Sequence, residues 1–278
     1  MPLPTFLLIG SMKSGTTSLW GYLHDHPEVF VPEEKEPDFF VAGIAWERGL
    51  DWYESLFDGA EHAKARGEAS TNYTKAHRFR GVPERIASIL PDVKLIYVMR
   101  NPIERMISHY LHLRATAQEN LPIERAFVEH RTYLETSRYA FQLGGYLERF
   151  PRERLLLMTA EELRDDPIES RTRVYSFLGV DTAPASDEAA LALHASAKKP
   201  IRSLTASRAE RTATFDFVRR LSPLPVKRLY NRLSTKRLTV KDVSISDALR
   251  ARLTEELRPE IEALRALMGD GFDGWGLA

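Results

Sequence analysis

One stretch near the amino terminus, from Phe6 to Leu19, constrains the fold more than any other part of the chain. An apolar run ends at Gly10, a loop of small residues with Lys13 follows, and apolar residues then recur at helical spacing. This order predicts a strand, a loop and a helix. Such a loop points backbone N–H groups at one place, where the helix dipole favours a phosphate or a sulfate. A buried strand followed by an ordinary Gly/Ser turn is the alternative.

The two glycines of this loop are spaced as in the nucleotide-triphosphate loop G-x-x-x-x-G-K-[ST], but the lysine is displaced. Lys13 lies two residues before Gly15, and Thr16 stands where that loop has its lysine. A lysine before the second glycine, followed by Thr-Thr-Ser, resembles the 5′-phosphosulfate loop of sulfotransferases that use 3′-phosphoadenosine 5′-phosphosulfate (PAPS). The resemblance implies a cofactor-binding loop made of Lys13, Ser14, Gly15, Thr16, Thr17 and Ser18.

A charged pair before two aromatic residues marks a second candidate site. Glu36 follows Lys35 and precedes Phe39-Phe40, so its carboxylate has the partly apolar setting that suits a general base, although a surface loop anchored by two phenylalanines is the alternative. In heparan sulfate sulfotransferases and their bacterial relatives, a His-Pro segment leads to a glutamate before paired aromatics, and that glutamate is the catalytic base. The match of His26-Pro27 and Glu36 to this order implies that Glu36 is the base, with Lys13 as the second catalytic residue.

Two further observations bear on this site. The segment 67–73, Gly-Glu-Ala-Ser-Thr-Asn-Tyr, also resembles the family pattern, and we expect it to end a second strand that lines the site, without roles for its single residues. Histidines compete for the role of base, because cytosolic sulfotransferases of phenols and steroids use one. By position, the candidates are His24, His26, His77, His109 and His112.

Residues 93–99 form an apolar, β-branched run that predicts a buried strand, and Asn101-Pro102 predicts the start of a helix. Arg100 then ends the strand, and Ser108 lies about two turns into the helix. A structural ion pair for Arg100 and a backbone-bonded hydroxyl for Ser108 are the alternatives. Strand, Arg-Asn-Pro, x-x-Arg and x-x-Ser resembles the sulfotransferase signature for the 3′-phosphate, which implies that Arg100 and Ser108 bind that phosphate of PAPS.

The segment from Lys198 to Lys241 is strongly basic, with thirteen Lys or Arg and two acidic residues. A solvated helical face is one explanation, and a lobe that gathers an anionic substrate is another. Sulfotransferases have a basic loop here that closes on the cofactor. The resemblance therefore extends to Lys199 and Arg202, although the local sequence departs from the family's forms.

Composition suits one soluble α/β domain. The chain has 278 residues, 43% hydrophobic and 28% charged, with no cysteine and a formal net charge of zero. The balanced charge argues against a nucleic-acid partner, and the eight scattered histidines indicate no metal site. No apolar run reaches the roughly 20 residues of a membrane span, and no secretory signal is evident, so we expect a cytoplasmic protein. The apolar spacing over 244–268 predicts a C-terminal helix that begins at a Ser244 capping box.

Together these patterns predict a P-loop-like three-layer α/β/α fold with a central parallel sheet, as a single domain over residues 1–278 with a basic helical lobe at 198–241. The predicted activity is sulfuryl transfer from PAPS, without a metal, to a hydroxyl or amine of a carbohydrate or glycoconjugate. A small-molecule natural product or a lipid is an alternative acceptor. A P-loop small-molecule kinase and a binding protein that has lost its chemistry are the rival functions. The sequence does not indicate the oligomeric state.

Overall fold

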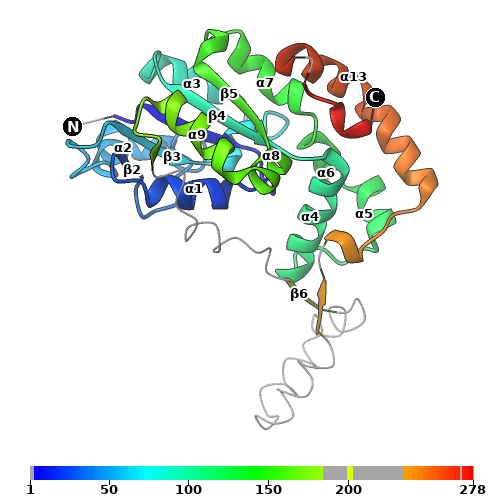
Figure 1. The fold of residues 1–278 in the computed structure, drawn as a ribbon. Coiled ribbons are helices and arrows are strands. Elements are labelled where there is room, and N and C mark those ends of the chain that lie inside the picture. The colour runs from blue at the N-terminus through cyan, green and yellow to red at the C-terminus, as the bar shows by residue number, and fades with distance from the viewer. Residues whose placement is uncertain (1–2, 184–198, 203–234, 239, 270, 278) are drawn as a thin grey trace, which may run out of the picture. The chain divides into compact units, whose positions relative to one another are not determined.

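The computed structural model describes residues 3–183, 199–202, 235–238, 240–269 and 271–277 (Figure 1). The chain forms two compact units. The first contains residues 1–102, 138–194 and 257–278, and the second contains residues 103–137 and 195–256. Most of the basic segment from Lys198 to Lys241 lies outside the described residues. Its predicted role in binding an anionic substrate or the cofactor therefore stays a prediction.

The first unit is built on a five-stranded parallel sheet in the order β2-β3-β1-β4-β5. The strands are β1 (Phe6–Gly10), β2 (Val29–Phe30), β3 (Ala65–Ala69), β4 (Lys94–Met99) and β5 (Leu155–Thr159). Every residue of β1 is buried, as expected for a parallel strand covered on both faces. The sheet order places β1 between β3 and β4, so the loop after β1 opens at the point where ligands bind in folds of this class.

Helices cover both faces of this sheet, because alternate strand residues point to opposite sides. Leu7 and Leu95 pack in one apolar cluster with side chains of α2 (Leu50–Ser55), α3 (Val82–Ile89), α7 (Tyr139–Leu147) and the last turns of α13 (Asp247–Met268). Leu8 and Ile96 pack in the other cluster with α1 (Thr16–His24), α8 (Ala160–Asp165) and α9 (Pro167–Leu178). The predicted three-layer α/β/α fold with a central parallel sheet is confirmed (Figure 1).

Short 3-10 turns connect several of these elements. They are η1 (Trp46–Arg48), η2 (Thr71–Thr74), η3 (Arg152–Arg154) and η7 (Gly274–Gly276). The turn η2 follows β3 directly, so the segment 67–73 ends a strand as predicted and then turns across its carboxyl end.

The second unit is mainly helical. Its elements are α5 (Ile123–Glu129), α6 (Thr132–Glu135), η6 (Val240–Asp242), the strands β6 (Lys199–Arg202) and β7 (Thr235–Leu238), most of α4 (Pro102–Ala115) and the first part of α13. Buried Arg105 donates to the carbonyl oxygen of Tyr133 at 2.6 Å, and buried Glu119 accepts the Tyr133 hydroxyl at 2.9 Å. None of the described helices is long and apolar enough to cross a membrane.

The described residues differ from the predicted secondary structure in two details. Residues 199–202 and 235–238 form an antiparallel pair of strands within the segment 198–241, and the rest of the helical lobe predicted there falls largely outside the described residues. Pro200 lacks the N–H that a helix interior needs, and it faces Arg237 across the pair. The C-terminal helix begins at Asp247, because the hydroxyl of Ser246, and not that of Ser244, accepts the N–H of Leu249 at 3.3 Å.

Candidate functional site

The loop between β1 and α1 has the backbone geometry of an anion-binding loop. Gly15 adopts a left-handed conformation with φ of 89°, and α1 begins at the next residue without a side-chain cap or an acidic residue in its first turn. The N–H groups of Thr16 and Thr17 have no acceptor among the described residues, because the first N–H groups of a helix have no intrahelical partner. A phosphate or sulfate matches these donors and the helix dipole, so the residues present fit the phosphosulfate of PAPS.

The loop is held in shape by its own contacts. The Ser11 N–H donates to the carbonyl oxygen of Val98 at 2.7 Å, and the hydroxyls of Ser11 and Ser14 lie 2.6 Å apart. Ser14 is therefore buried within the loop, whereas Thr17 is exposed and Lys13 is partly exposed. The cofactor contacts predicted for this loop stay predictions, with Ser14 engaged in shaping it.

Gly10 is the tightest point of the loop. With φ of 147°, it has a conformation that L side chains rarely adopt, and an added Cβ would lie 2.1 Å from the Thr74 hydroxyl oxygen. That hydroxyl donates to the carbonyl oxygen of Ile9 at 2.8 Å, so it is not free to withdraw.

We expect Gly10→Ala to lower the free energy of unfolding by about 2–4 kcal/mol, since it combines backbone strain with a steric clash. Urea unfolding of the two proteins measures the difference. Gly59→Ala is the matched control, because Gly59 also has positive φ, of 86°, but has nothing within 4 Å of its added Cβ. Equal losses in the two variants would mean that the crowding against Thr74 is unimportant.

The predicted base lies on a turn that reaches this loop. The Lys35 ammonium donates to the Thr17 hydroxyl at 2.7 Å, and burial lowers the Lys35 pKa while the charge of Glu36 raises it. Glu36 has a left-handed φ of 59°, donates its N–H to the Ala69 carbonyl at 3.1 Å and accepts the Thr71 hydroxyl at 3.4 Å. Its side chain is exposed at the carboxyl end of the sheet. The structure thus brings the predicted loop and the predicted base together in the first unit.

Two buried carboxyl groups beneath this turn are site features that the sequence did not reveal. Glu68, which is 1% exposed, accepts the hydroxyls of Tyr73 at 2.6 Å, Ser70 at 2.8 Å and Tyr53 at 3.4 Å. Asp38, which is 7% exposed, donates its N–H to the Ser70 hydroxyl oxygen at 3.0 Å. The resemblance of the segment 67–73 to the family pattern is the signal that could have drawn attention to Glu68, without indicating its role.

Burial perturbs both carboxyl groups. It raises the pKa of Glu68 to about 8, against the hydrogen bonds from Tyr73 and Ser70, which lower it. It also raises the pKa of Asp38 to about 6, against the hydrogen bond from Asn72 and with help from the Glu36 charge. Perturbed carboxyl groups of this kind concentrate at functional sites.

The turn that carries Arg100 is also firmly held in the first unit. The Tyr139 hydroxyl donates to the Arg100 carbonyl at 2.8 Å, and the Asn101 N–H donates to the Glu161 carboxylate at 3.1 Å. The indole N–H of Trp275 donates to the other oxygen of Glu161 at 3.1 Å, and its ring lies 6.0 Å from that of Tyr139. The C-terminal residues thus help to fix the backbone at the end of β4.

The other predicted contacts of the cofactor belong to the second unit. Ser108 is buried on α4, and Lys199 and Arg202 lie on β6. Their predicted joint role with Arg100 stays a prediction. Of the candidate histidines, His26 is buried and engages both ring nitrogens, with the Asp181 carbonyl at 2.7 Å and the Glu28 N–H at 3.1 Å. His26 therefore fixes a turn and is unavailable as a base.

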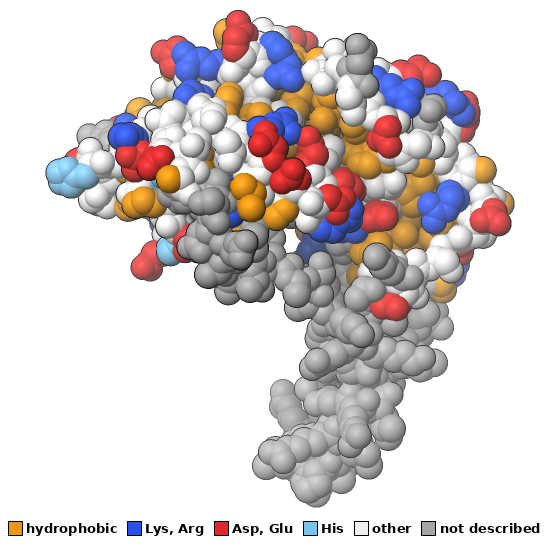
Figure 2. Space-filling model, in the orientation of Figure 1, with side chains coloured by type: hydrophobic (Ala, Val, Ile, Leu, Met, Phe, Trp, Pro, Cys, Tyr) orange, Lys and Arg blue, Asp and Glu red, His pale blue; other side chains and the backbone are white. Residues whose placement is uncertain are grey.

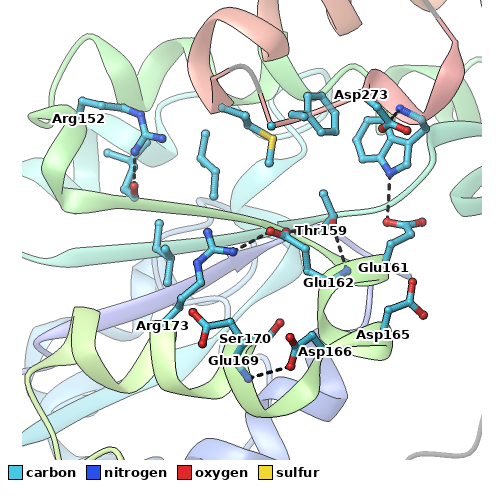
Figure 3. A pocket seen from close by; sticks show the side chains of 17 residues that line it. Arg152, Thr159, Glu161, Glu162, Asp165, Asp166, Glu169, Ser170, Arg173 and Asp273 are labelled. Atoms are coloured by element: carbon cyan, nitrogen blue, oxygen red, sulfur yellow. Dashed lines mark hydrogen bonds and ion pairs between the residues drawn. The ribbon is translucent and has the colours of Figure 1, made fainter.

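A hollow of about 720 Å³ lies elsewhere in the first unit, along the outer edge of β5 (Figure 3). It is bordered by α8 and α9 on one side and by the C-terminal residues Met268, Phe272 and Trp275 on the other. Acidic side chains gather over α8 and α9 (Figure 2). Those that line the hollow are Glu161, Glu162, Asp165, Asp166 and Glu169. Asp273 adds to this negative charge, and Arg152 and Arg173 offset part of it, so the net charge of the lining disfavours an anionic ligand. No cluster of three metal-binding side chains occurs within the described ranges.

The chain is similar in sequence to curated sulfotransferases. The chain is 31% identical over 199 residues to the mouse bifunctional heparan sulfate N-deacetylase/N-sulfotransferase 2, a match covering 64% of this chain and 22% of that protein. It is 35% identical over 189 residues to human heparan sulfate glucosamine 3-O-sulfotransferase 6, covering 64% of this chain and 52% of that protein. The chain thus spans about half or less of the length of these curated relatives.

A solved sulfotransferase from Alicyclobacillus acidocaldarius superposes with a TM-score of 0.72 at 24% identity, covering 99% of both chains, which supports the fold. The sequence profile described as the sulfotransferase domain matches residues 3–221. This match covers β1 with its loop, Glu36 and Arg100. The chain belongs to the sulfotransferase domain family.

Proposed function

We propose that this sulfotransferase moves a sulfuryl group from PAPS to a hydroxyl or amine of a carbohydrate or glycoconjugate. One observation carries the proposal: the Lys35 ammonium donates to the Thr17 hydroxyl at 2.7 Å and so ties the turn of Glu36 to the anion-binding loop. A base and an anion site must be adjacent for transfer from a bound anion to a nucleophile. The uncapped start of α1 supports an anionic donor at this place.

The residues have separate roles in this proposal. PAPS, when bound, supplies the activated sulfuryl group. Lys13 and the N–H groups at the start of α1 stabilise negative charge on the leaving phosphate and the sulfonate oxygens. Glu36 takes the proton of the acceptor hydroxyl or amine. As in phosphoryl transfer, positioning and charge stabilisation do most of the work, and these residues require no metal for it.

The proposed acceptor class rests on the relatives. Those reported above are named for heparan sulfate, and each match covers 64% of this chain. We therefore propose a carbohydrate acceptor, with a natural product or a lipid as the second candidate. Incubation with radiolabelled PAPS and a panel of one N-deacetylated, unsulfated heparan polysaccharide, one phenol and one lipid-linked sugar tests the class. Label in the phenol alone would overturn the carbohydrate assignment.

The donor is tested by binding. We expect calorimetry to show selective binding of adenosine 3′,5′-bisphosphate over 5′-AMP and ATP, and we expect Arg100→Ala to weaken it by roughly 10–100-fold. Loss of a charged hydrogen-bond donor to a phosphate has this effect. Arg80→Ala is the control, because Arg80 is exposed in the same unit. Equal affinity for ATP in the wild type would favour the kinase alternative.

A further inference from the structure

The turn that carries Glu36 is fastened to the end of β3 at alternate residues. The Glu36 N–H donates to the Ala69 carbonyl at 3.1 Å, the Asp38 N–H to the Ser70 hydroxyl oxygen at 3.0 Å, and the Phe40 N–H to the Tyr73 hydroxyl oxygen at 3.5 Å. Ser70 and Tyr73 both donate to buried Glu68. Two of the three hydrogen bonds that hold the turn therefore end on a hydroxyl group that donates to Glu68. Glu68 itself makes no hydrogen bond to the turn.

One polar atom in this network is left without a partner. The Oδ2 of Asp38 accepts the Asn72 amide at 2.6 Å, and Asn72 in turn accepts the Lys75 ammonium at 2.7 Å. The Oδ1 of Asp38 is buried and has no hydrogen-bond donor. A buried carboxylate oxygen without a donor is costly, and such a group calls for an explanation.

A proton on Glu68 would free the Ser70 hydroxyl hydrogen for the Asp38 carboxyl group. In the arrangement with ionised Glu68, the Ser70 hydroxyl donates to Glu68, over 2.8 Å. That distance suits a hydrogen bond in either direction. If Glu68 is protonated and donates to Ser70, the Ser70 hydrogen can turn from Glu68 toward the Asp38 carboxyl group, which is close enough to Ser70 for this hydroxyl to lower the Asp38 pKa. Ser70 then accepts from Glu68 and from the Asp38 N–H, donates once, and is fully satisfied.

We propose that Glu68, Ser70 and Asp38 form a buried relay that holds one proton and fixes the turn of the catalytic base. Glu68 and Ser70 are positioning residues, because they act on Glu36 through the turn. This inference rests on the proposed function for the role of Glu36, but the hydrogen-bond relay itself does not.

The charges around the relay agree with a single retained proton near neutral pH. Burial raises the pKa of Glu68 to about 8 and that of Asp38 to about 6. Glu68 is otherwise faced by the neutral hydroxyls of Tyr53 and Tyr73, and Asp38 is faced by the charges of Glu36 and Lys75. Asp38 and Glu68 therefore lose their protons in two steps. When Glu68 ionises at the second step, the Ser70 hydroxyl donates to Glu68 again and no longer to Asp38.

Hydrogen exchange of the peptide that contains Asp38 and Phe40 tests the relay without any substrate. After correction for intrinsic rates, we expect the wild type to lose about tenfold in protection between pH 7 and pH 9, the effect of one buried hydrogen bond. Glu68→Gln keeps a donor toward Ser70 at every pH, so its protection stays level. Ser70→Ala is poorly protected at both pH values, and Ser70→Thr restores protection. Level wild-type protection, or full protection in Ser70→Ala, would overturn the relay.

Turnover with radiolabelled PAPS and the N-deacetylated heparan polysaccharide tests the consequence for catalysis. We expect Ser70→Ala to lower kcat about tenfold while the affinity for adenosine 3′,5′-bisphosphate stays the same. The ratio of kcat at pH 9 to kcat at pH 7 should be several-fold higher in Glu68→Gln than in the wild type. Lys35 is present in both proteins, so any effect of its protonation on kcat is the same in both and does not change this comparison.

Glu119→Gln is the matched control for a buried carboxylate with comparable donors, since Glu119 accepts the Tyr133 hydroxyl and the N–H groups of Asn120 and Leu121. It should follow the wild-type profile in both measurements. An altered pH ratio in Glu119→Gln equal to that in Glu68→Gln would reduce Glu68 to a general structural role. Absence of turnover and of nucleotide binding in the wild type would instead refute the proposed function, and the exchange data would still decide the relay.

Discussion

Replacing Glu36 by Gln is expected to lower kcat by roughly 10²–10⁴-fold, the contribution typical of a general base. Gln keeps the size of the side chain and an oxygen that accepts the Thr71 hydroxyl, which lies 3.4 Å from Glu36 in the wild type. It has no proton affinity in the useful range, so only proton removal from the acceptor is lost. Steady-state kinetics with radiolabelled PAPS would measure kcat and the KM for each substrate.

Two comparisons make this test specific. Glu34→Gln changes an exposed glutamate two residues away and should retain wild-type kcat. The affinity of Glu36→Gln for adenosine 3′,5′-bisphosphate should remain within about twofold of the wild type, because the proposed function assigns nucleotide binding to the loop after β1 and not to Glu36. Full turnover in Glu36→Gln would remove Glu36 from the mechanism and return the search for the base to the remaining histidines.

The core of the fold was predictable because most of its strands are marked by local apolar runs in the sequence. Runs such as 6–9 and 95–99 are apolar over their whole length, which identifies buried parallel strands. The strand β3 is different, since Ala-Arg-Gly-Glu-Ala has little apolar content. Its place depends on a close approach to β1, where a Cβ at Gly67 would lie 2.4 Å from the Phe6 carbonyl oxygen. Contacts of this kind join distant residues and leave no periodic signal.

The candidate site also contains residues that the sequence could predict and residues that it could not. The loop residues, Glu36 and Arg100 could be predicted because each stands in a short motif at the end of a strand or the start of a helix. Asp38 and Glu68 could not be recognised as a pair, because thirty residues separate them and their link runs through the Ser70 hydroxyl. The division into two units was equally hidden, because α4 and α13 each continue without a break from one unit into the other.

The second large effect concerns stability and pH. Burial raises the pKa of Glu68 from 4.5 to about 8, so the folded protein keeps a proton that the unfolded chain has already lost over this range. Unfolding then releases a proton, and stability falls as pH rises, by about 1.4 kcal/mol per pH unit. Below pH 4.5 both states are protonated, and above about pH 8 both are ionised, so the slope is confined between these values. Because burial also raises the pKa of Asp38, to about 6, Asp38 makes the fall of stability with pH steeper below about pH 6.

The unfolding free energy of wild type minus that of Glu68→Gln isolates this group. We expect the difference to fall by on the order of 4 kcal/mol between pH 5 and pH 8, so that the variant gains relative stability in alkaline solution. All four tryptophans belong to the first unit, as Glu68 does, so urea unfolding followed by tryptophan fluorescence reports on the right part of the chain.

Glu28 is the control for this measurement, because its pKa is lowered in the folded protein and not raised. The hydrogen bond from Lys64 lowers the pKa of Glu28, so its contribution to stability is present above pH 4.5 and is lost only as pH falls further. The difference between wild type and Glu28→Gln should therefore be level from pH 5 to pH 8. A level difference for Glu68→Gln as well would mean that Glu68 is ionised in the folded protein at neutral pH. The buried proton beneath the turn of Glu36, and the relay built on it, would then be excluded.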